Sequence, residues 1–141
     1  MQPIQVYASF DRTRDEDLRQ RLLRDSLNAD SPFVVADWSG RDVASPGLGD
    51  PTTLPARIGR VDAVIVLCGE QTDSSIEVGL ELRATQALGK PYFLVWGRRE
   101  HTCTRPSGAR RDDNMYTWIW ALLKFQIALE IRKSAPRGSP A

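Results

Sequence analysis

The feature that most constrains the fold is an unbroken apolar run, Ala63–Cys68, which is rich in β-branched residues. A strand with one face in water alternates apolar and polar residues, whereas a strand covered on both faces loses that alternation. The run therefore predicts a central strand of a parallel sheet, with helices packed on both faces of that sheet.

Three more short apolar runs predict strands, at Ile4–Phe10, Phe33–Ala36 and Tyr92–Trp96. Apolar residues at helical spacing predict helices over about residues 14–27, 53–61, 73–88 and 115–132. Strands and helices that alternate four times indicate parallel strands joined by right-handed crossovers. We therefore expect an α/β fold of the flavodoxin-like type, a three-layer sandwich whose short parallel sheet has the strand order 2-1-3-4.

The last two predicted helices carry more specific local signals. Ser74 followed by Glu77 fits a capping box at the start of the first of them, and Gly89 suits the position after its end. One apolar side of the final helix is expected to pack in the core or against a second copy of the chain. That side comprises Met115, Trp118, Ile119, Leu122 and Leu129.

The 141 residues carry a formal net charge of +1, so no overall charge directs the chain toward nucleic acid or a membrane. The length suits one domain, expected over residues 1–133, with a flexible tail over 134–141. No apolar run approaches the roughly 20 residues of a membrane span and no signal peptide is recognised, so we expect a cytoplasmic protein. Cys68 and Cys103 are expected to be reduced, and with the lone His101 they cannot form a zinc site.

In parallel α/β sheets, ligands bind beyond the carboxyl ends of the strands, at the switch point of the strand order. Here that point lies between the first and third strands. The candidate binding residues at this rim are Ser9, Phe10, Asp11, Asp37, Trp38 and Ser39. Their carboxylates and hydroxyls suit ribose hydroxyls, and their two aromatic rings suit a planar base. Neither a Gly-x-Gly-x-x-Gly turn nor a Walker sequence is present, which disfavours a conventional dinucleotide oxidoreductase or a nucleoside triphosphatase.

Each rim residue also has a purely structural interpretation. Asp11 and Asp37 can cap the turns that follow them. Ser9 can be a satisfied polar group at a strand end, and Trp38 can plug the end of the sheet. The sequence leaves these alternatives open.

Several motifs follow one another at a distinctive spacing. They are Val6–Asp11, Asp37-Trp38-Ser39, Ile58 to Leu67, and the stretch from Gly69 through Thr72, Ser75 and Glu81 to Gly89-Lys90-Pro91. With Tyr116 and Trp118, they resemble the bacterial TIR-like family over about residues 4–125.

The resemblance implies a TIR-like fold and an enzyme that cleaves the nicotinamide–ribose bond of NAD, as in the Thoeris anti-phage system. The products would be hydrolysed or cyclised ADP-ribose used as a defence signal. The resemblance places the catalytic carboxylate at Glu81, with Glu77 one turn earlier among the substrate-binding residues. NAD is then the substrate, no separate cofactor or metal is implied, and TIR-like contacts imply assembly into a homo-oligomer.

Cleavage of this bond builds positive charge on the anomeric carbon of the ribose. A nearby carboxylate stabilises that charge, binds the ribose hydroxyls or attacks the carbon. Because nicotinamide is already a cationic leaving group, no strong general acid is needed, and one well-placed carboxylate is enough.

Two other functions stay open. Family members often carry tryptophan just before the catalytic glutamate, where this chain has Glu77 and Leu80, so a non-catalytic TIR-like interaction module is one alternative. Nucleoside deoxyribosyltransferases place a glutamate eight residues before Gly-Lys-Pro, as Glu81 stands before Gly89, so an enzyme acting on nucleosides is another. From the sequence alone, Glu81 can also be a solvated helix residue.

Overall fold

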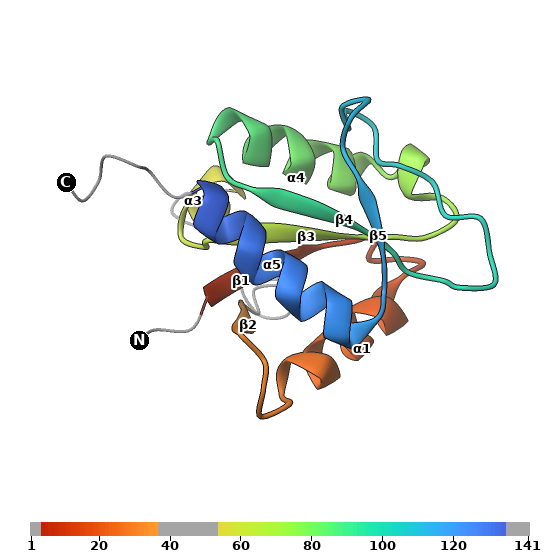
Figure 1. The fold of residues 1–141 in the computed structure, drawn as a ribbon. Helices are drawn as coiled ribbons and strands as arrows, with labels where there is room; N and C mark the ends of the chain where they lie inside the picture. Colours follow the sequence, from red (N-terminus) through yellow and green to blue (C-terminus); the bar gives the residue numbers. More distant parts are fainter. Residues whose placement is uncertain (1–3, 37–53, 135–141) are drawn as a thin grey trace.

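The computed structural model describes residues 4–36 and 54–134, and these build an α/β fold around a parallel sheet (Figure 1). The strands are β1 (Ile4–Ser9), β2 (Phe33–Ala36), β3 (Ala63–Cys68), β4 (Tyr92–Trp96) and β5 (Met115–Thr117). They lie in the order β2-β1-β3-β4-β5, and every neighbouring pair is parallel. The α/β class and the parallel sheet are as predicted, but the order differs from 2-1-3-4 by a fifth strand at the β4 edge.

The helices connect the strands in chain order and follow the last one. They are α1 (Glu16–Ser26), α3 (Leu54–Gly59), the short 3-10 helix η3 (Thr72–Ser74), α4 (Ile76–Ala87) and α5 (Trp120–Ser134). None of the helices in the described part of the chain combines the length and the apolar character needed to cross a membrane.

The central strand β3 contributes to two hydrophobic cores, one on each face of the sheet. All six of its residues have 0 % exposed surface, which confirms the strand predicted from Ala63–Cys68. Ile65 and its alternate neighbours pack with Leu22 of α1 and Ile127 of α5. Val64 and its alternate neighbours pack with Ile58 of α3 and Val78 of α4. Helices therefore cover both faces of the sheet (Figure 1).

The C-terminal part of the chain differs most from the prediction. Residues 115–117 form β5, which pairs with β4 through Leu94↔Met115 and Trp96↔Thr117, so the predicted helix over 115–132 is wrong at its start. Because α5 begins at Trp120, its buried positions are Leu123 and Ile127. Of the predicted apolar side, Trp118 is buried in the core as expected, whereas Ile119 and Leu122 are exposed, and their packing against a second copy stays a prediction.

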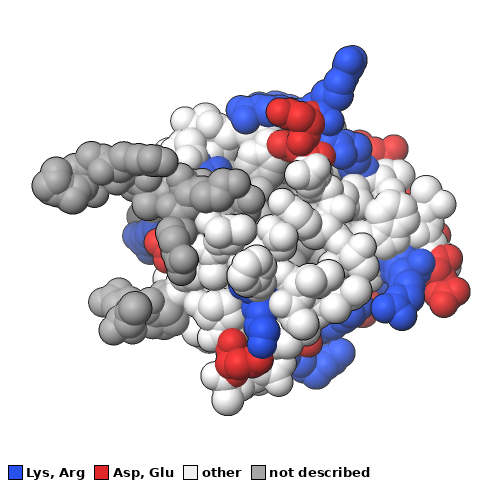
Figure 2. Space-filling model, in the orientation of Figure 1, with Lys and Arg blue, Asp and Glu red and all other residues white. Residues whose placement is uncertain are grey.

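The outer surface of α5 carries exposed apolar side chains. Leu122 and Phe125, with 54 % and 62 % of their surfaces exposed, project from it. Figure 2 shows largely uncharged atoms over α5, with charged side chains toward the edges of the same face.

The ends of α4 show one failed prediction and one confirmed one. The capping box is wrong, because α4 starts at Ile76 and its cap is Ser75, whose hydroxyl accepts a hydrogen bond from the Val78 N–H. The C-terminal signal is confirmed, because Gly89 has a φ of 69° and closes the helix end. Its N–H bonds to the carbonyl of Gln86 and the next N–H to that of Thr85, the pattern of a Schellman motif.

Some predictions fall on residues 37–53 and 135–141, which lie outside the described residues. They concern Asp37, Trp38, Ser39 and most of the tail. The boundary between one domain over 1–133 and a tail over 134–141 likewise stays a prediction.

Candidate active site

Glu81 lies on the side of α4 that packs against the sheet, with 3 % of its surface exposed. Tyr7 and Ser9 of β1 face it because side chains two positions apart point to the same face of a strand. Val6 and Ala8 alternate with them, and both pack in the core under α1 and α5. The site is therefore built where the carboxyl end of β1 meets the second turn of α4.

Three side chains donate hydrogen bonds to the Glu81 carboxylate. The Tyr7 hydroxyl donates to Oε2 at 2.7 Å and the Ser9 hydroxyl to Oε1 at 2.5 Å. The guanidinium of Arg12 donates from Nη2 to Oε2 at 3.0 Å. Glu81 is thus a buried and paired carboxylate, so the alternative of a solvated helix residue does not hold.

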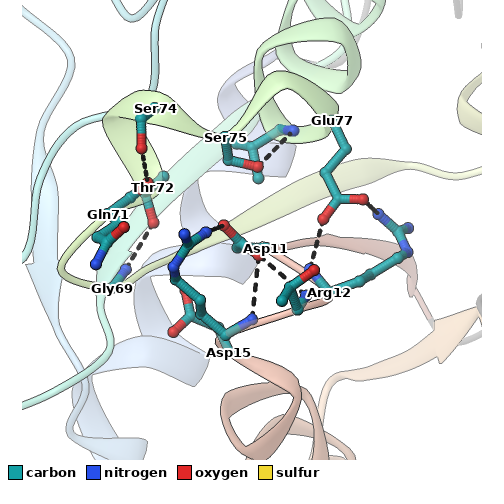
Figure 3. A network of polar contacts seen from close by, with 12 residues as sticks. Asp11, Arg12, Asp15, Gly69, Gln71, Thr72, Ser74, Ser75 and Glu77 are labelled. Atoms are coloured by element: carbon teal, nitrogen blue, oxygen red, sulfur yellow. Dashed lines mark hydrogen bonds and ion pairs between the residues drawn. The ribbon is translucent and has the colours of Figure 1, made fainter.

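Arg12 joins the loop after β1 to both glutamates of α4. Its main-chain N–H donates to Glu77 Oε2 at 2.5 Å, and its Nη1 lies 3.5 Å from Glu77 Oε1 (Figure 3). The guanidinium carbon also stands 5.0 Å from the centre of the Phe10 ring. Glu77 therefore anchors the loop and the arginine, which is a different role from the predicted capping box.

Burial and neighbouring charges shift the pKa values of two members of this cluster, Arg12 and Tyr7. Burial, the largest single effect, lowers the pKa of Arg12, but the charges of Glu81, Tyr7 and Glu77 and the hydrogen bond to Glu81 together outweigh it, so the pKa of Arg12 is raised. Burial and the same carboxylate raise the pKa of Tyr7, while the charges of Arg12 and Arg57 oppose that shift. At neutral pH, Arg12 is charged and Tyr7 keeps the proton that it donates to Glu81.

Asp11 is occupied by the loop in which it lies. Its Oδ1 accepts the main-chain N–H groups of Thr13 and Arg14 at 3.0 and 3.1 Å. Its Oδ2 accepts Nη1 of Arg14 at 3.1 Å, and its carbonyl accepts the N–H of Asp15 at 2.8 Å. Figure 3 shows Asp11 beside Asp15. The geometry matches the turn-capping interpretation rather than a carboxylate held ready for a ribose.

The other predicted rim residues divide into two groups. Ser9 has no exposed surface, and its hydroxyl is bound to Glu81. Phe10 is 1 % exposed and packs in the core on the α1 and α5 face, so its ring offers no free face to a base. Asp37, Trp38 and Ser39 are outside the described residues.

Two cavities lie near this cluster, and they differ greatly in size. An open groove of about 380 Å³ runs between the β1–α1 loop and the start of α4, and Glu77 and Leu80 line it. Glu81 does not line that groove. A second cavity touches Tyr7 and Arg12 but measures only about 10 Å³. The larger of these two spaces therefore reaches Glu77, and neither of them is lined by Glu81.

A second polar cluster lies beyond the ends of β3 and β4. Arg98 donates to Asp15 and Asp17 at 2.8 Å each, which ties the end of β4 to the start of α1. Burial raises the pKa of Asp15, although the hydrogen bond from Arg98 opposes it. The hydrogen bond from Arg98 lowers the pKa of the more exposed Asp17. Glu70 and His101 line a groove of about 200 Å³ beside this cluster.

Sequence reasoning missed two members of the Glu81 cluster, Tyr7 and Arg12. Tyr7 was read as an apolar residue of the first strand, although its position two residues before Ser9 puts both on one face. Arg12 follows the strand end directly, where parallel sheets collect their site residues. The period of the strand and the position after it are therefore the signals that could have found them.

Comparisons with known proteins add no family assignment. No family model matches the chain, and no curated protein matches it. Among the residues that the structure describes, no group of three or more His, Cys, Asp or Glu side chains is placed to hold a metal ion.

Proposed function

We propose that this chain is a TIR-like enzyme of the flavodoxin-like type that cleaves the nicotinamide–ribose bond of NAD, with Glu81 as its catalytic carboxylate. The observation that carries the proposal is the buried Glu81 carboxylate held by Tyr7, Ser9 and Arg12 at the carboxyl end of β1. That is the edge of a parallel sheet where α/β proteins bind ligands.

The chemistry asks for a carboxylate that stays charged and fixed beside the reacting sugar. The hydroxyls of Tyr7 and Ser9 hold both oxygens of Glu81 in place, so its orientation is set before a substrate arrives. A fixed negative charge stabilises the positive charge that develops on the anomeric carbon. The leaving group needs no acid, which agrees with a site built around one carboxylate.

The proposal includes a role in anti-phage signalling and assembly into a homo-oligomer, both taken from the TIR-like resemblance. The exposed Leu122 and Phe125 of α5 are compatible with contacts between copies. Activity is therefore best followed over a wide range of protein concentration, because a site completed by assembly is silent in a dilute monomer.

The test is release of nicotinamide from NAD by the purified chain, followed chromatographically beside Glu81→Gln. The substitution keeps the shape of the side chain and removes its charge, so we expect at least a roughly 100-fold loss of rate. The matched control is Glu100→Gln, which removes the same charge from an exposed position after β4 and should leave the rate unchanged.

Two outcomes contradict the proposal. One is no release at any protein concentration, with or without lysate from phage-infected cells. The other is release that survives Glu81→Gln in a variant whose melting temperature shows that it is folded. Base exchange between deoxynucleosides in the same assay would instead support the deoxyribosyltransferase-like enzyme.

One observation favours the non-catalytic interaction module as a second candidate. All three donors to Glu81 come from the chain itself, so the carboxylate already has the partners that a structural residue needs. If Glu81 is structural, Glu81→Gln lowers stability and no NAD cleavage is seen in either protein.

A further inference from the structure

Arg12 is the only partner of Glu81 in the described cluster that has a substantial route to solvent. Its side chain is 24 % exposed, whereas Tyr7 and Ser9 are 3 % and 0 % exposed. A molecule that approaches Glu81 from solvent therefore meets the guanidinium of Arg12 before it meets the carboxylate.

Arg12 also has an unused hydrogen-bond donor. Its Nη2 serves Glu81 and its Nη1 lies beside Glu77, but its buried Nε has no hydrogen-bond partner among the residues described. Buried N–H groups are nearly always paired, so an idle donor on a charged side chain points to an acceptor that arrives from elsewhere. The planar fork of arginine matches the oxygens of a phosphate group, which it binds through two parallel hydrogen bonds.

The space beside Arg12 is small. The cavity there measures about 10 Å³, room for no more than one water, and Arg19 also lines it. Because Arg12 is the most exposed of the described partners of Glu81, a nucleotide that approaches Glu81 along this side must move Arg12 aside. Such a movement separates a charged pair, so it needs a ligand that replaces the lost negative charge.

We propose that Arg12 exchanges Glu81 for the diphosphate of an incoming nucleotide, which opens the site and selects diphosphate-containing nucleotides over nucleosides. The inference rests on the proposed function for the location of the site. Its binding step needs no cleavage, so it is tested separately from the NAD reaction. Arg12 is here a ligand-binding residue that also uncovers Glu81.

The experiment measures binding of ADP-ribose to the full chain by titration calorimetry. ADP-ribose carries the diphosphate and lacks the nicotinamide bond, so binding is read without reaction. We expect Arg12→Gln to weaken binding by at least about tenfold, since it removes a charge-assisted pair of hydrogen bonds. Arg12→Lys keeps the charge but loses the fork, and we expect an intermediate affinity.

Glu81→Gln distinguishes an Arg12 that binds the diphosphate from an Arg12 that is only structural. It removes the charge that competes with the diphosphate for Arg12, so we expect ADP-ribose to bind several-fold more tightly than to the unchanged protein. The control is Arg83→Gln, which removes an arginine from the exposed side of α4 and should leave the affinity unchanged. Melting curves confirm that each variant is folded.

The exchange is overturned if ADP-ribose does not bind to the unchanged protein. It is also overturned if Arg12→Gln and Arg12→Lys bind ADP-ribose as well as the unchanged protein, or if adenosine binds as tightly as ADP-ribose. Absence of NAD cleavage with ADP-ribose binding intact would reject the proposed enzyme and leave the exchange standing. The failures of the two proposals are thus distinguishable.

Discussion

Glu81 carries a negative charge into the layer between a helix and a sheet, where an unpaired charge costs several kcal/mol. Its donors come from three positions near the end of one strand, at residues 7, 9 and 12. Two of them are neutral hydroxyls and only Arg12 is charged, so the cluster holds a carboxylate in place with a single counter-ion. Removing any one donor should therefore lower the free energy of unfolding of the protein.

Tyr7→Phe tests this at a single hydroxyl. The phenylalanine ring fits the same space but leaves Oε2 of Glu81 with one donor fewer, so we expect a loss of about 1.5–3 kcal/mol in the free energy of unfolding, as for hydrogen bonds to charged groups. Urea unfolding measures this loss of free energy. The control is Tyr116→Phe, because the hydroxyl of Tyr116 makes no hydrogen bond with the residues that the structure describes. Equal losses in the two variants would contradict the assignment.

The same hydroxyl makes stability depend on alkaline pH. Burial and the Glu81 charge raise the pKa of Tyr7 above its ordinary value of 10.0. Since unfolding restores the ordinary value, the contribution of Tyr7 is fully present below that pH and is lost as the pH rises above it. We expect the free energy of unfolding to fall above pH 10.0, and to fall less steeply in Tyr7→Phe. Urea unfolding at a series of pH values measures this dependence. The same decline with pH in both proteins would contradict the prediction.

At the scale of elements, the strands were the easiest to predict. β2, β3 and β4 have the bounds predicted from their apolar runs, because each run is short, β-branched or aromatic, and bounded by polar residues or proline. β5 was missed because two of its three residues are half-buried, the third is exposed, and an apolar helix follows closely. Periodicity alone cannot divide such a segment, since the sheet edge of β4 decides where the strand ends.

The candidate site was predictable in place but not in detail. The strand order and the rule for parallel sheets located it at the end of β1, and the TIR-like resemblance pointed to Glu81. The partners of Glu81 depend on which loop residue folds back onto α4, and that is a tertiary contact across 69 residues between Arg12 and Glu81. Asp11 shows the converse, because its local turn hydrogen bonds outweigh its position at the rim.

The close approach of β4 to α1 gives a test at the same scale. A Cβ added at Gly97, just after β4, would lie 2.5 Å from Leu18 and 2.8 Å from the carbonyl oxygen of Cys68. We expect Gly97→Ala to destabilise the fold by about 1–3 kcal/mol, because the backbone must shift to make room.

Gly59→Ala is the matched control, because nothing lies within 4 Å of a Cβ added at that position of α3. Alanine favours a helix over glycine by about 0.5–1 kcal/mol, so this change should stabilise the protein or leave it unchanged. Thermal and urea unfolding of both variants measure the difference. We expect a loss of stability in Gly97→Ala alone, and a similar loss in Gly59→Ala would contradict the tight packing around Gly97.

At the scale of the whole molecule, Arg98 connects the end of β4 with the start of α1, more than 80 residues earlier in the chain. Arg98→Gln should cost about 1–3 kcal/mol, because it leaves the buried Asp15 carboxylate without its counter-ion. Asp17 is 64 % exposed, so Asp17→Asn should cost less than about 1 kcal/mol.

A second substitution separates the two carboxylates. Adding Asp15→Asn to Arg98→Gln removes the stranded charge, so we expect the double variant to recover part of the lost stability in urea unfolding. The loss in Arg98→Gln should also shrink at acid pH, because burial already raises the pKa of Asp15 and protonation removes the charge. If stability is not recovered in either measurement, the loss in Arg98→Gln does not come from the stranded charge of Asp15.

The strand order has a consequence for how the chain is made. β1 and β2 form the first pair, and β3, β4 and β5 then lie successively outward from β1. Each strand can thus join an open edge in the order in which the ribosome releases it, and none must insert between two strands already paired. A nascent chain that has reached β3 already holds the three strands on which the rest of the sheet is added.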